Sequence, residues 1–477
     1  MIAALLAAGT AVLAAKPPAY APATTAPSAL VRNARADLAP LFDNIDWQTR
    51  THVARVLDAF RNAQVSSSDF GGVDGYGHGD IGREKLDAIY AELFGAEAAL
   101  VRIQCFSGTH AIACCLYGVL RPGDTLLTVS GQPYDTLEEV IGTRGAAVGT
   151  PGDSAAAGLT GSLMEFGVRW EQVALLPDGK FDYAAIREAL ERPRDGRVAM
   201  VHVQRSCGYQ WRRSIPVREI GEFADWLADW RAERDGAPRP ASAAPGRGSA
   251  GAEPWQPSWP VLFVDNCYGE FVEKCEPTAL GADLIAGSLI KNPGGTLAPT
   301  GGYVAGRAQL VQAASNRLSA PGVEGGATLG QNRLLLQGLF HAPQVVGEAL
   351  KGATLAARVF AERGFACKPH ALTPRADIVQ CIQLGTRRNL LDFCEVVQRY
   401  SPVSAHVRPI AGVSPGYGDE VVFADGTFIE GSTAELSADG PLREPYAVYM
   451  QGGNHWTQWA IILDAFFARL EQRQANA

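Results

Sequence analysis

Short apolar stretches alternate with amphipathic ones along the middle of the chain, and this alternation constrains the fold more than any other feature. The apolar stretches have the length of buried strands, and the amphipathic ones have a helical period. In chain order they are a helix at 83–93, a strand at 99–104, a helix at 111–120, strands at 125–129 and 198–204, a helix at 217–234 and a strand at 261–265. Such alternation predicts an α/β fold with a mostly parallel, doubly wound sheet.

Composition excludes several classes of protein. The 477 residues are 47% hydrophobic and 19% charged, enough to bury the core of a globular chain. The formal charge is −8, and no basic stripe runs among aromatic residues, so we expect no nucleic-acid partner. The nine cysteines form no C-x-x-C pair and no metal-ligand spacing. We expect a reduced compartment, no metal site, and cysteines that serve as small apolar side chains.

Four segments are expected along the chain, one of them with an insertion. Residues 1–30 begin with an apolar run that is too short for a membrane span of about 20 residues. We interpret this segment as a targeting or disordered extension of a cytoplasmic or organellar protein, with secretion or an artefactual start as alternatives. The remaining segments are an arm at 31–75, a large domain at 76–345, and a small C-terminal domain at 346–477. Within the large domain, the Pro- and Gly-rich stretch 236–260 is expected to be a flexible insertion.

An acid and a lysine stand where an open α/β sheet places its ligands. Asp265 ends the strand VLFVD, and Lys291 follows the next strand-like run, 283–287, in a Gly- and Pro-containing loop. A lysine can hold the aldehyde of pyridoxal phosphate (PLP) as an imine, and an acid can keep its pyridine nitrogen protonated. For either residue alone, an ordinary surface lysine or a loop-binding aspartate is the simpler interpretation. The pair becomes convincing only together with a phosphate loop.

Such a loop lies at the first strand-to-helix turn of the large domain. Ser107, Gly108 and Thr109 join the strand to the next helix, whose free N–H groups can hold a phosphate. Tyr134 lies beyond the following strand, where its ring can stack on a flat cofactor. Arg205 and Ser206 follow a further strand and could reach the cofactor or the substrate, although a loop salt bridge is an equal alternative for the arginine.

At this point the chain resembles a known family, the PLP-dependent aluminium-resistance or methionine-gamma-lyase-like proteins, which are related to the cystathionine lyases. The resemblance extends from about Val31 to the C-terminal helix. It rests on six blocks in order: GYGHGDIGREKLDAIYAELFGAEAALVR, SGTHAI, GQPYDTLEEVIG, LFVDNCYGEFVE, GSLIKNPGG and GTFIEGSTAELSADGPLREPYAVYMQGG. Two positions depart from the family pattern: Cys207 stands where a basic residue is usual, and His78 where an aromatic is commoner.

The resemblance implies a fold, a cofactor and an assembly. The fold is the aspartate-aminotransferase-like fold of PLP-dependent transferases (fold type I), with a seven-stranded sheet in the large domain. Lys291 would be the imine lysine, Asp265 the partner of the pyridine nitrogen and Tyr134 the stacking ring. Ser107 to Thr109 and Ser288 would bind the phosphate. Tyr76 and Arg83 would complete the phosphate site of a neighbouring subunit, which implies a homodimer or homotetramer.

The implied activity is that of a carbon–sulfur lyase acting on a sulfur-containing amino acid, with no membrane partner. An arginine of the small domain should bind the substrate carboxylate, and Arg375 and Arg443 are equal candidates. Other PLP chemistry, such as that of a transferase or a desulfurase, and a catalytically silent regulatory protein remain alternatives. Of the histidines, only His110 adjoins the phosphate loop, and His202, His341 and His455 are interpreted as structural.

Overall fold

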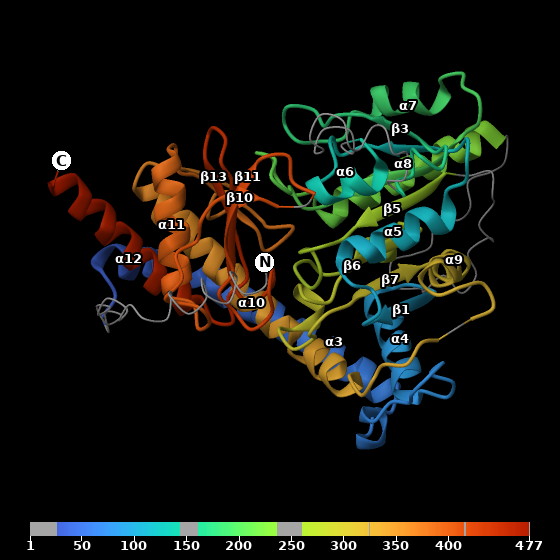
Figure 1. Ribbon diagram of the computed structural model, residues 1–477, viewed down its shortest axis with the longest axis horizontal. Helices are drawn as coiled ribbons and strands as arrows, with labels where there is room; N and C mark the ends of the chain where they lie inside the picture. The colour runs from blue at the N-terminus through green and yellow to red at the C-terminus, as the bar shows by residue number, and fades with distance from the viewer. Residues whose placement is uncertain (1–25, 144–160, 236–259, 324, 415, 477) are drawn as a thin grey trace, which may run out of the picture.

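The computed structural model describes residues 26–143, 161–235, 260–323, 325–414 and 416–476. Two sheets, each covered by helices, lie side by side along the longest axis of the molecule (Figure 1). The larger sheet uses strands between residues 98 and 306, and the smaller sheet uses strands between 366 and 451. The targeting segment expected at the N-terminus and the insertion expected at 236–260 lie outside the described residues, except for 26–30 and Pro260.

The larger sheet has seven strands in the order β1-β7-β6-β5-β4-β2-β3. Their bounds are β1 Ala98–Arg102, β2 Thr125–Thr128, β3 Arg169–Gln172, β4 Val198–Gln204, β5 Val261–Asp265, β6 Leu284–Ser288 and β7 Gly302–Gly306. Pairing is parallel from β3 to β6, whereas β7 is antiparallel to both of its neighbours. The mostly parallel sheet predicted from the sequence is confirmed.

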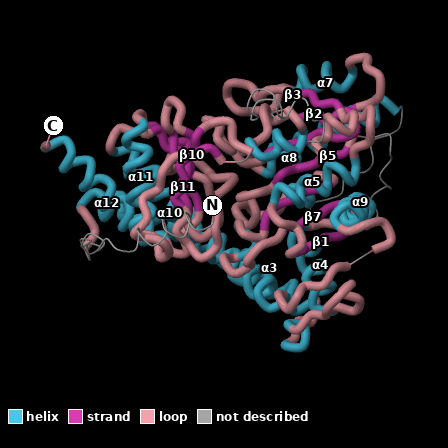
Figure 2. Tube along the Cα trace, viewed as in Figure 1, coloured by secondary structure: helices cyan, strands magenta, loops and turns pink. Residues whose placement is uncertain are grey.

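Helices cover both faces of this sheet (Figure 2). They are α4 Ile81–Phe94, α5 Gly108–Val119, α6 Asp135–Ile141, α7 Tyr183–Glu191, α8 Val217–Asp235 and α9 Ala308–Leu318, with the short 3-10 helices η2 Pro277–Leu280 and η3 Asn292–Gly294. Successive strand residues point to opposite faces. Leu262 and Val264 therefore enter the core beneath α4 and α8, whereas Val261 and Phe263 enter the core beneath α5 and α9. This two-sided burial explains why the strand sequences are continuously apolar.

The smaller sheet has six antiparallel strands in the order β10-β11-β12-β13-β9-β8. Their bounds are β8 Ala366–Lys368, β9 Gln380–Gln383, β10 Gly412–Val413, β11 Glu420–Ala424, β12 Ser437–Pro441 and β13 Ala447–Gln451. Helices α11 Arg387–Arg399 and α12 Trp456–Ala475 cover one of its faces, and the other face is turned toward the larger sheet (Figure 1).

One long helix, α10 Asn332–Glu362, connects the two cores. Its first half contributes Leu335, Leu339 and Val346 to the core of the larger sheet, and its second half contributes Leu355 and Phe360 to the core of the smaller one. The N-terminal helices α2 Ala29–Asp37 and α3 Ala39–Asn62 pack along it, and η1 Ser67–Phe70 leads from them into α4. The helical pattern predicted from Gly330 onward is confirmed.

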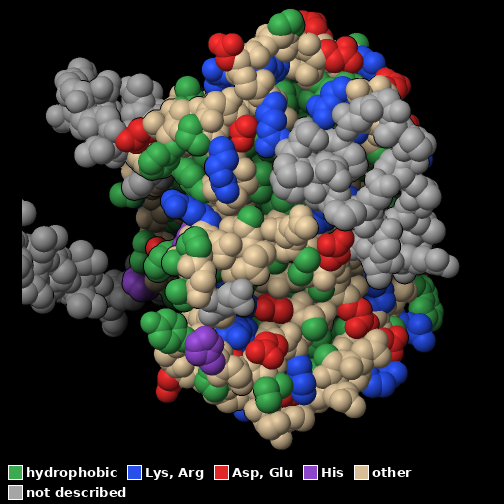
Figure 3. Space-filling model, turned by 90° about the vertical axis from the view of Figure 1, so that its right-hand side faces the viewer, with side chains coloured by type: hydrophobic (Ala, Val, Ile, Leu, Met, Phe, Trp, Pro, Cys, Tyr) green, Lys and Arg blue, Asp and Glu red, His purple; other side chains and the backbone are tan. Residues whose placement is uncertain are grey.

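The surface mixes charges of both signs, and basic and acidic side chains are interspersed on the face of the larger domain seen in Figure 3. Among the described residues, no helix combines the length and the apolar character needed to cross a bilayer.

Two glycines let α10 approach the loop that follows β6. A Cβ atom at Gly338 would lie 2.2 Å from the carbonyl oxygen of Gly294. We expect Gly338→Ala to lower the free energy of unfolding by about 1–3 kcal/mol, because two backbone segments would have to separate. This loss should appear although alanine is the better helix former by about 1 kcal/mol. Chemical denaturation measures it. Gly71→Ala is the control, since a Cβ there meets no atom within 4 Å, and an equal loss in both variants would contradict the prediction.

Candidate active site

Lys291 lies at the start of the loop that follows β6, on the side of the large domain that faces the smaller sheet. Its Nζ is 3.8 Å from the centre of the Tyr268 ring, a cation–π distance. Burial alone would lower the pKa of the Lys291 ammonium, but the acidic groups around it, led by the Cys267 thiol, outweigh burial and raise the pKa. Asn292 fixes the loop, because its Nδ2 donates to the carbonyl oxygens of Tyr268 and Glu270, both at 2.9 Å.

Asp265 lies at the end of β5, as predicted, and only 4% of it is exposed. Its Oδ1 accepts a hydrogen bond of 3.1 Å from the Cys267 backbone N–H. Burial raises the pKa of this carboxyl group, and the charge of Lys291 opposes the rise. Among the described residues, no lysine or arginine forms an ion pair with Asp265 within 4 Å. A buried carboxyl group without a direct ion-pair partner fits a site that receives a protonated ring nitrogen.

The predicted phosphate loop begins α5 on the same side of the sheet. Ser107 is the N-cap of this helix, and its side chain accepts a hydrogen bond of 3.1 Å from the His110 N–H. Gly108 lies against Ser288 at the end of β6, so close that an added Cβ would be 2.8 Å from the Ser288 Cβ. The N–H groups of the first helical turn and the helix dipole therefore point at this junction, a geometry that suits an anion.

Tyr134 is tied to that loop and to the neighbouring strand. Its hydroxyl group is 2.8 Å from the Thr109 Oγ1, and its backbone N–H donates to the Gln204 Oε1 at 2.7 Å. Its pKa is raised by burial first and by the charge of Asp265 second. The structure thus brings five predicted features into one neighbourhood: the loop 107–109, Tyr134, Asp265, Ser288 and Lys291.

Arg205 is not brought into that neighbourhood. Its side chain is fully buried and donates to the Asn266 Oδ1 at 2.7 Å and to the Glu273 Oε2 at 2.6 Å. Consecutive residues at the end of a strand point in opposite directions, so Gln204 turns toward Tyr134 and Arg205 turns away. The salt bridge that was the alternative for Arg205 is the arrangement found. The adjacent Ser206 lies instead beside the carboxyl group of Asp377, where burial raises the pKa of the acid and the Ser214 and Ser206 side chains oppose the rise.

Tyr76 and Arg83 also lie apart from Lys291 within one chain. The Arg83 guanidinium donates to the carbonyl oxygens of Gly77 at 2.7 Å and of Gly326 at 3.0 Å. Tyr76 is 67% exposed, and its ring stacks on His78 at 5.7 Å. His110 accepts a hydrogen bond from the Phe106 N–H at 3.2 Å, so it stabilises the loop that contains Ser107.

The two candidate arginines differ sharply in their surroundings. Arg443 is exposed and forms an ion pair with Asp419 on the surface. Arg375 donates to neutral oxygens, the Gln380 Oε1 at 2.6 Å and the Thr354 Oγ1 at 3.2 Å. Burial lowers the pKa of the Arg375 guanidinium to about 10. A half-buried guanidinium bonded to neutral groups retains its capacity to bind an anion, and this favours Arg375.

Three residues near Lys291 were not identified from the sequence. Tyr268 offers its ring to the Lys291 ammonium from an unusual left-handed backbone conformation, with φ of 69°. Arg212 donates to the backbone carbonyl of Gln204 at 2.9 Å, and its charge acts on Asp265. Asp439 lies on β12 of the smaller sheet and is 4% exposed. The only signal in the sequence was the alternation of polar and small residues in SADGP.

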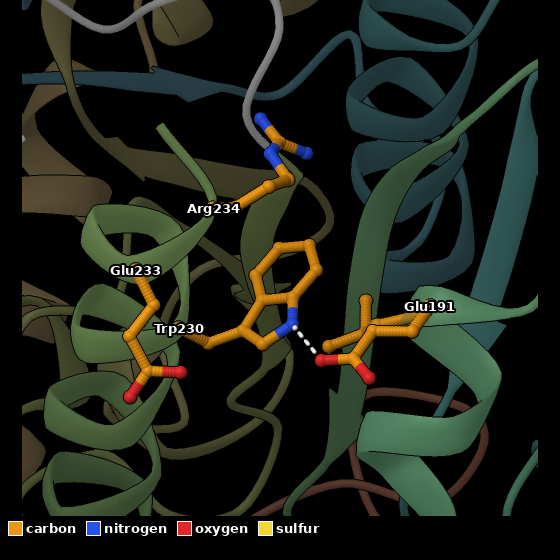
Figure 4. A pocket seen from close by; sticks show the side chains of 5 residues that line it. Glu191, Trp230, Glu233 and Arg234 are labelled. Carbon is orange, nitrogen blue, oxygen red and sulfur yellow. Dashed lines mark hydrogen bonds between the residues drawn. The ribbon is translucent and has the colours of Figure 1, made fainter. Parts of the chain in front are cut away.

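A separate pocket lies between α7 and α8 and contains none of the predicted site residues. Trp230 is one of the lining residues and donates to the Glu191 Oε1 at 3.1 Å, while the Arg234 guanidinium lies 5.1 Å from the centre of the Trp230 ring (Figure 4). Lining residues that bind one another by a hydrogen bond and a cation–π contact are typical of packing between two helices.

The large, mostly parallel sheet and the second, smaller sheet together form the fold of the PLP-dependent transferases, fold type I. A distant solved structure, the pyridoxal-5'-phosphate-dependent protein YhfS from Escherichia coli, shares the fold alone, with a TM-score of 0.53 and 17% identity over 89% of this chain and 97% of that one. The methionine gamma-lyase family model matches residues 27–233 and 257–471. The chain belongs to the methionine gamma-lyase family.

Two nearer relatives are similar over almost their full length. The chain is 43% identical over 420 residues to the protein YnbB of Bacillus subtilis, covering 88% of this chain and 90% of that protein. A solved structure from Listeria monocytogenes, of a proposed cystathionine beta-lyase involved in aluminium resistance, has a TM-score of 0.80 and 39% identity. It covers 92% of this chain and 99% of that one. The resemblance inferred from the sequence blocks is therefore confirmed at the level of family and fold.

Proposed function

We propose that the chain is a PLP-dependent carbon–sulfur lyase that acts on a sulfur-containing amino acid. The observation that carries the proposal is the convergence of Lys291, Asp265, Tyr134 and the N-terminus of α5 at one end of the larger sheet. Membership of the methionine gamma-lyase family supports it. When bound, the cofactor supplies an electron sink that stabilises negative charge on the α-carbon of an amino acid.

The residues of the site suit each part of this cofactor. Lys291 would attach to its aldehyde carbon, and attachment requires that the proton held by the Lys291 amine leave first. Asp265 would hold a proton on the ring nitrogen, and the Tyr134 ring would cover one face of the pyridine. The N–H groups of Gly108 and Thr109, with the Ser107 and Ser288 hydroxyls, would bind the phosphate.

Substrate handling requires a base and a carboxylate receptor. The Lys291 amine would also serve as the base that removes the α-proton, and the Tyr268 ring, 3.8 Å from Nζ, would help to hold the amine in place. Arg375 would bind the α-carboxylate. Loss of a thiol from the β- or γ-carbon, followed by hydrolysis, yields a keto acid and ammonia. We further propose a homodimer or homotetramer in which Tyr76 and Arg83 serve the neighbouring subunit.

Product analysis tests the reaction. Purified protein reconstituted with PLP should convert cystathionine, methionine or cysteine into a keto acid, ammonia and a sulfur product in equal amounts. Formation of a new amino acid instead of a keto acid would identify a transferase, and transfer of sulfur to an acceptor would identify a desulfurase. Protein that binds PLP and leaves all three substrates unchanged would favour the silent regulatory protein.

A further inference from the structure

The smaller sheet presents a polar face to Lys291. Along β12 and β13, Ala438, Val448 and Met450 enter the helix-covered core, so the alternate residues Asp439 and Tyr449 point to the other side. Tyr449 packs there against Cys207 and Tyr209 of the large-domain loop. This face therefore closes over the end of the larger sheet where the proposed cofactor lies.

Asp439 is a buried acidic side chain of this face that accepts several hydrogen bonds. The Tyr209 hydroxyl and the Gln451 Nε2 donate to its two carboxyl oxygens, the latter at 3.1 Å, and the Ser432 hydroxyl lies 3.4 Å from Oδ1. Donors from three separate segments therefore fix the orientation of one carboxyl group.

A short chain of contacts joins Asp439 to Lys291. Tyr268, whose ring contacts the Lys291 ammonium, donates its hydroxyl to the Ser432 carbonyl oxygen at 3.4 Å. The Ala434 N–H donates at 3.2 Å to the carbonyl oxygen of Ile290, the residue before Lys291. The segment that holds Asp439 is thus in contact with the loop that holds the lysine, and the charge of Lys291 acts on Asp439.

The charge of Asp439 lacks a dedicated partner. In the part of the chain that the structure describes, no lysine or arginine comes within 4 Å of its carboxyl group. Burial raises its pKa to about 6, so the group is mostly ionised at neutral pH. A buried carboxylate is stable when a cation or several hydrogen bonds compensate it, and here only the hydrogen bonds are present. Lys291, whose charge acts on Asp439, is committed to the cofactor in the proposed function.

We propose that Asp439 determines substrate specificity by binding a second ammonium group, at the end of the substrate distant from the α-carbon. The substrate class would be thioethers that join two amino-acid halves. This inference rests on the proposed function. The α-amine is excluded as the bound group because it must react at the cofactor next to Lys291, whereas Asp439 lies across the domain interface.

Binding of two uncleavable probes tests the assignment. The probes are 2,6-diaminopimelate, which carries the second amine and lacks a sulfur atom, and 2-aminopimelate, which lacks that amine. Isothermal titration calorimetry on the PLP-loaded wild-type protein should show about 10- to 100-fold tighter binding of the diamino probe. In Asp439→Asn this preference should fall to about onefold, while binding of 2-aminopimelate changes little. Asp58→Asn, at a position 61% exposed on α3, makes the same charge change and should retain the preference.

Equal affinity of wild-type protein for the two probes would overturn the assignment, and this result does not depend on how well the variant folds. Equal weakening of both probes in Asp439→Asn would also overturn it, because it would indicate a structural role. Uptake of PLP and elimination from cystathionine, methionine and cysteine are measured on the same wild-type preparation. If these persist while the preference is absent, the specificity assignment fails alone; if they are absent, the proposed function fails.

Discussion

Lys291→Ala should remove the covalent attachment of PLP and reduce the elimination rate by a factor of about 10² to 10⁴, the contribution typical of a positioned general base. Both losses come from one atom, because the same Nζ would hold the cofactor and remove the α-proton. Borohydride reduction followed by mass spectrometry measures attachment, since the reduced adduct survives unfolding. The wild-type protein should gain the mass of one reduced cofactor, and the variant should gain none.

The matched control for this experiment is Lys180→Ala, which removes a lysine that is 64% exposed and lies beside Asp178. This variant should keep both the adduct and the rate. A full adduct on Lys291→Ala would show that another lysine carries the cofactor, and it would contradict the assignment of the site. The loop around Lys291 should survive the substitution, because Asn292 and not Lys291 holds the backbone of Tyr268 and Glu270.

Arg375→Ala should lower kcat/KM by a factor of about 30 to 4,000, which corresponds to about 2–5 kcal/mol for leaving a buried charge without its partner. Most of the loss should appear in KM, because the guanidinium contacts the carboxylate and not the bond that breaks. Arg375→Lys should recover only part of it, since an ammonium cannot bind a carboxylate with two parallel hydrogen bonds. Steady-state kinetics on any substrate that the wild-type protein cleaves provides the measurement.

Arg443→Ala provides the comparison within the same domain. Its ion pair with Asp419 is exposed, and exposed pairs contribute about 0–1 kcal/mol, so we expect less than about a fivefold change in kcat/KM. A large loss in this variant together with a small one in Arg375→Ala would reverse the assignment of the carboxylate receptor.

The parts of the site that follow directly from strand ends could be predicted from the sequence. Strand β5 agrees with its predicted bounds because a five-residue apolar run that ends in an acid has few other interpretations in an α/β chain. The charges of Asp265 and Lys291 act on each other because the ends of neighbouring strands share one edge of the sheet. The alternation of side chains along β4 also predicts that Gln204 and Arg205 point to opposite faces of the sheet, if it is continued to the residue after the strand.

The remainder depends on contacts between segments that are distant in the sequence. Asp439 and Tyr209 are 230 positions apart, and their hydrogen bond exists only because the smaller sheet lies against the large domain. Arg375 and Arg443 carry the same group, and only the neighbours that folding brings to each distinguish them. The contact between Tyr268 and Lys291 depends on a left-handed backbone conformation at Tyr268, which a tyrosine disfavours and which the sequence therefore does not predict.

Helix α10 has a consequence for how the protein unfolds. Because one continuous helix supplies buried leucines to both cores, melting either half would expose an apolar stripe on the other. We therefore expect the two sheets to unfold as one cooperative unit, because a fragment that ends within residues 332–362 would lack part of the core on which its own sheet rests. The chain differs in this respect from proteins whose domains are joined by a flexible tether, and we expect no stable half when it is cut at that helix.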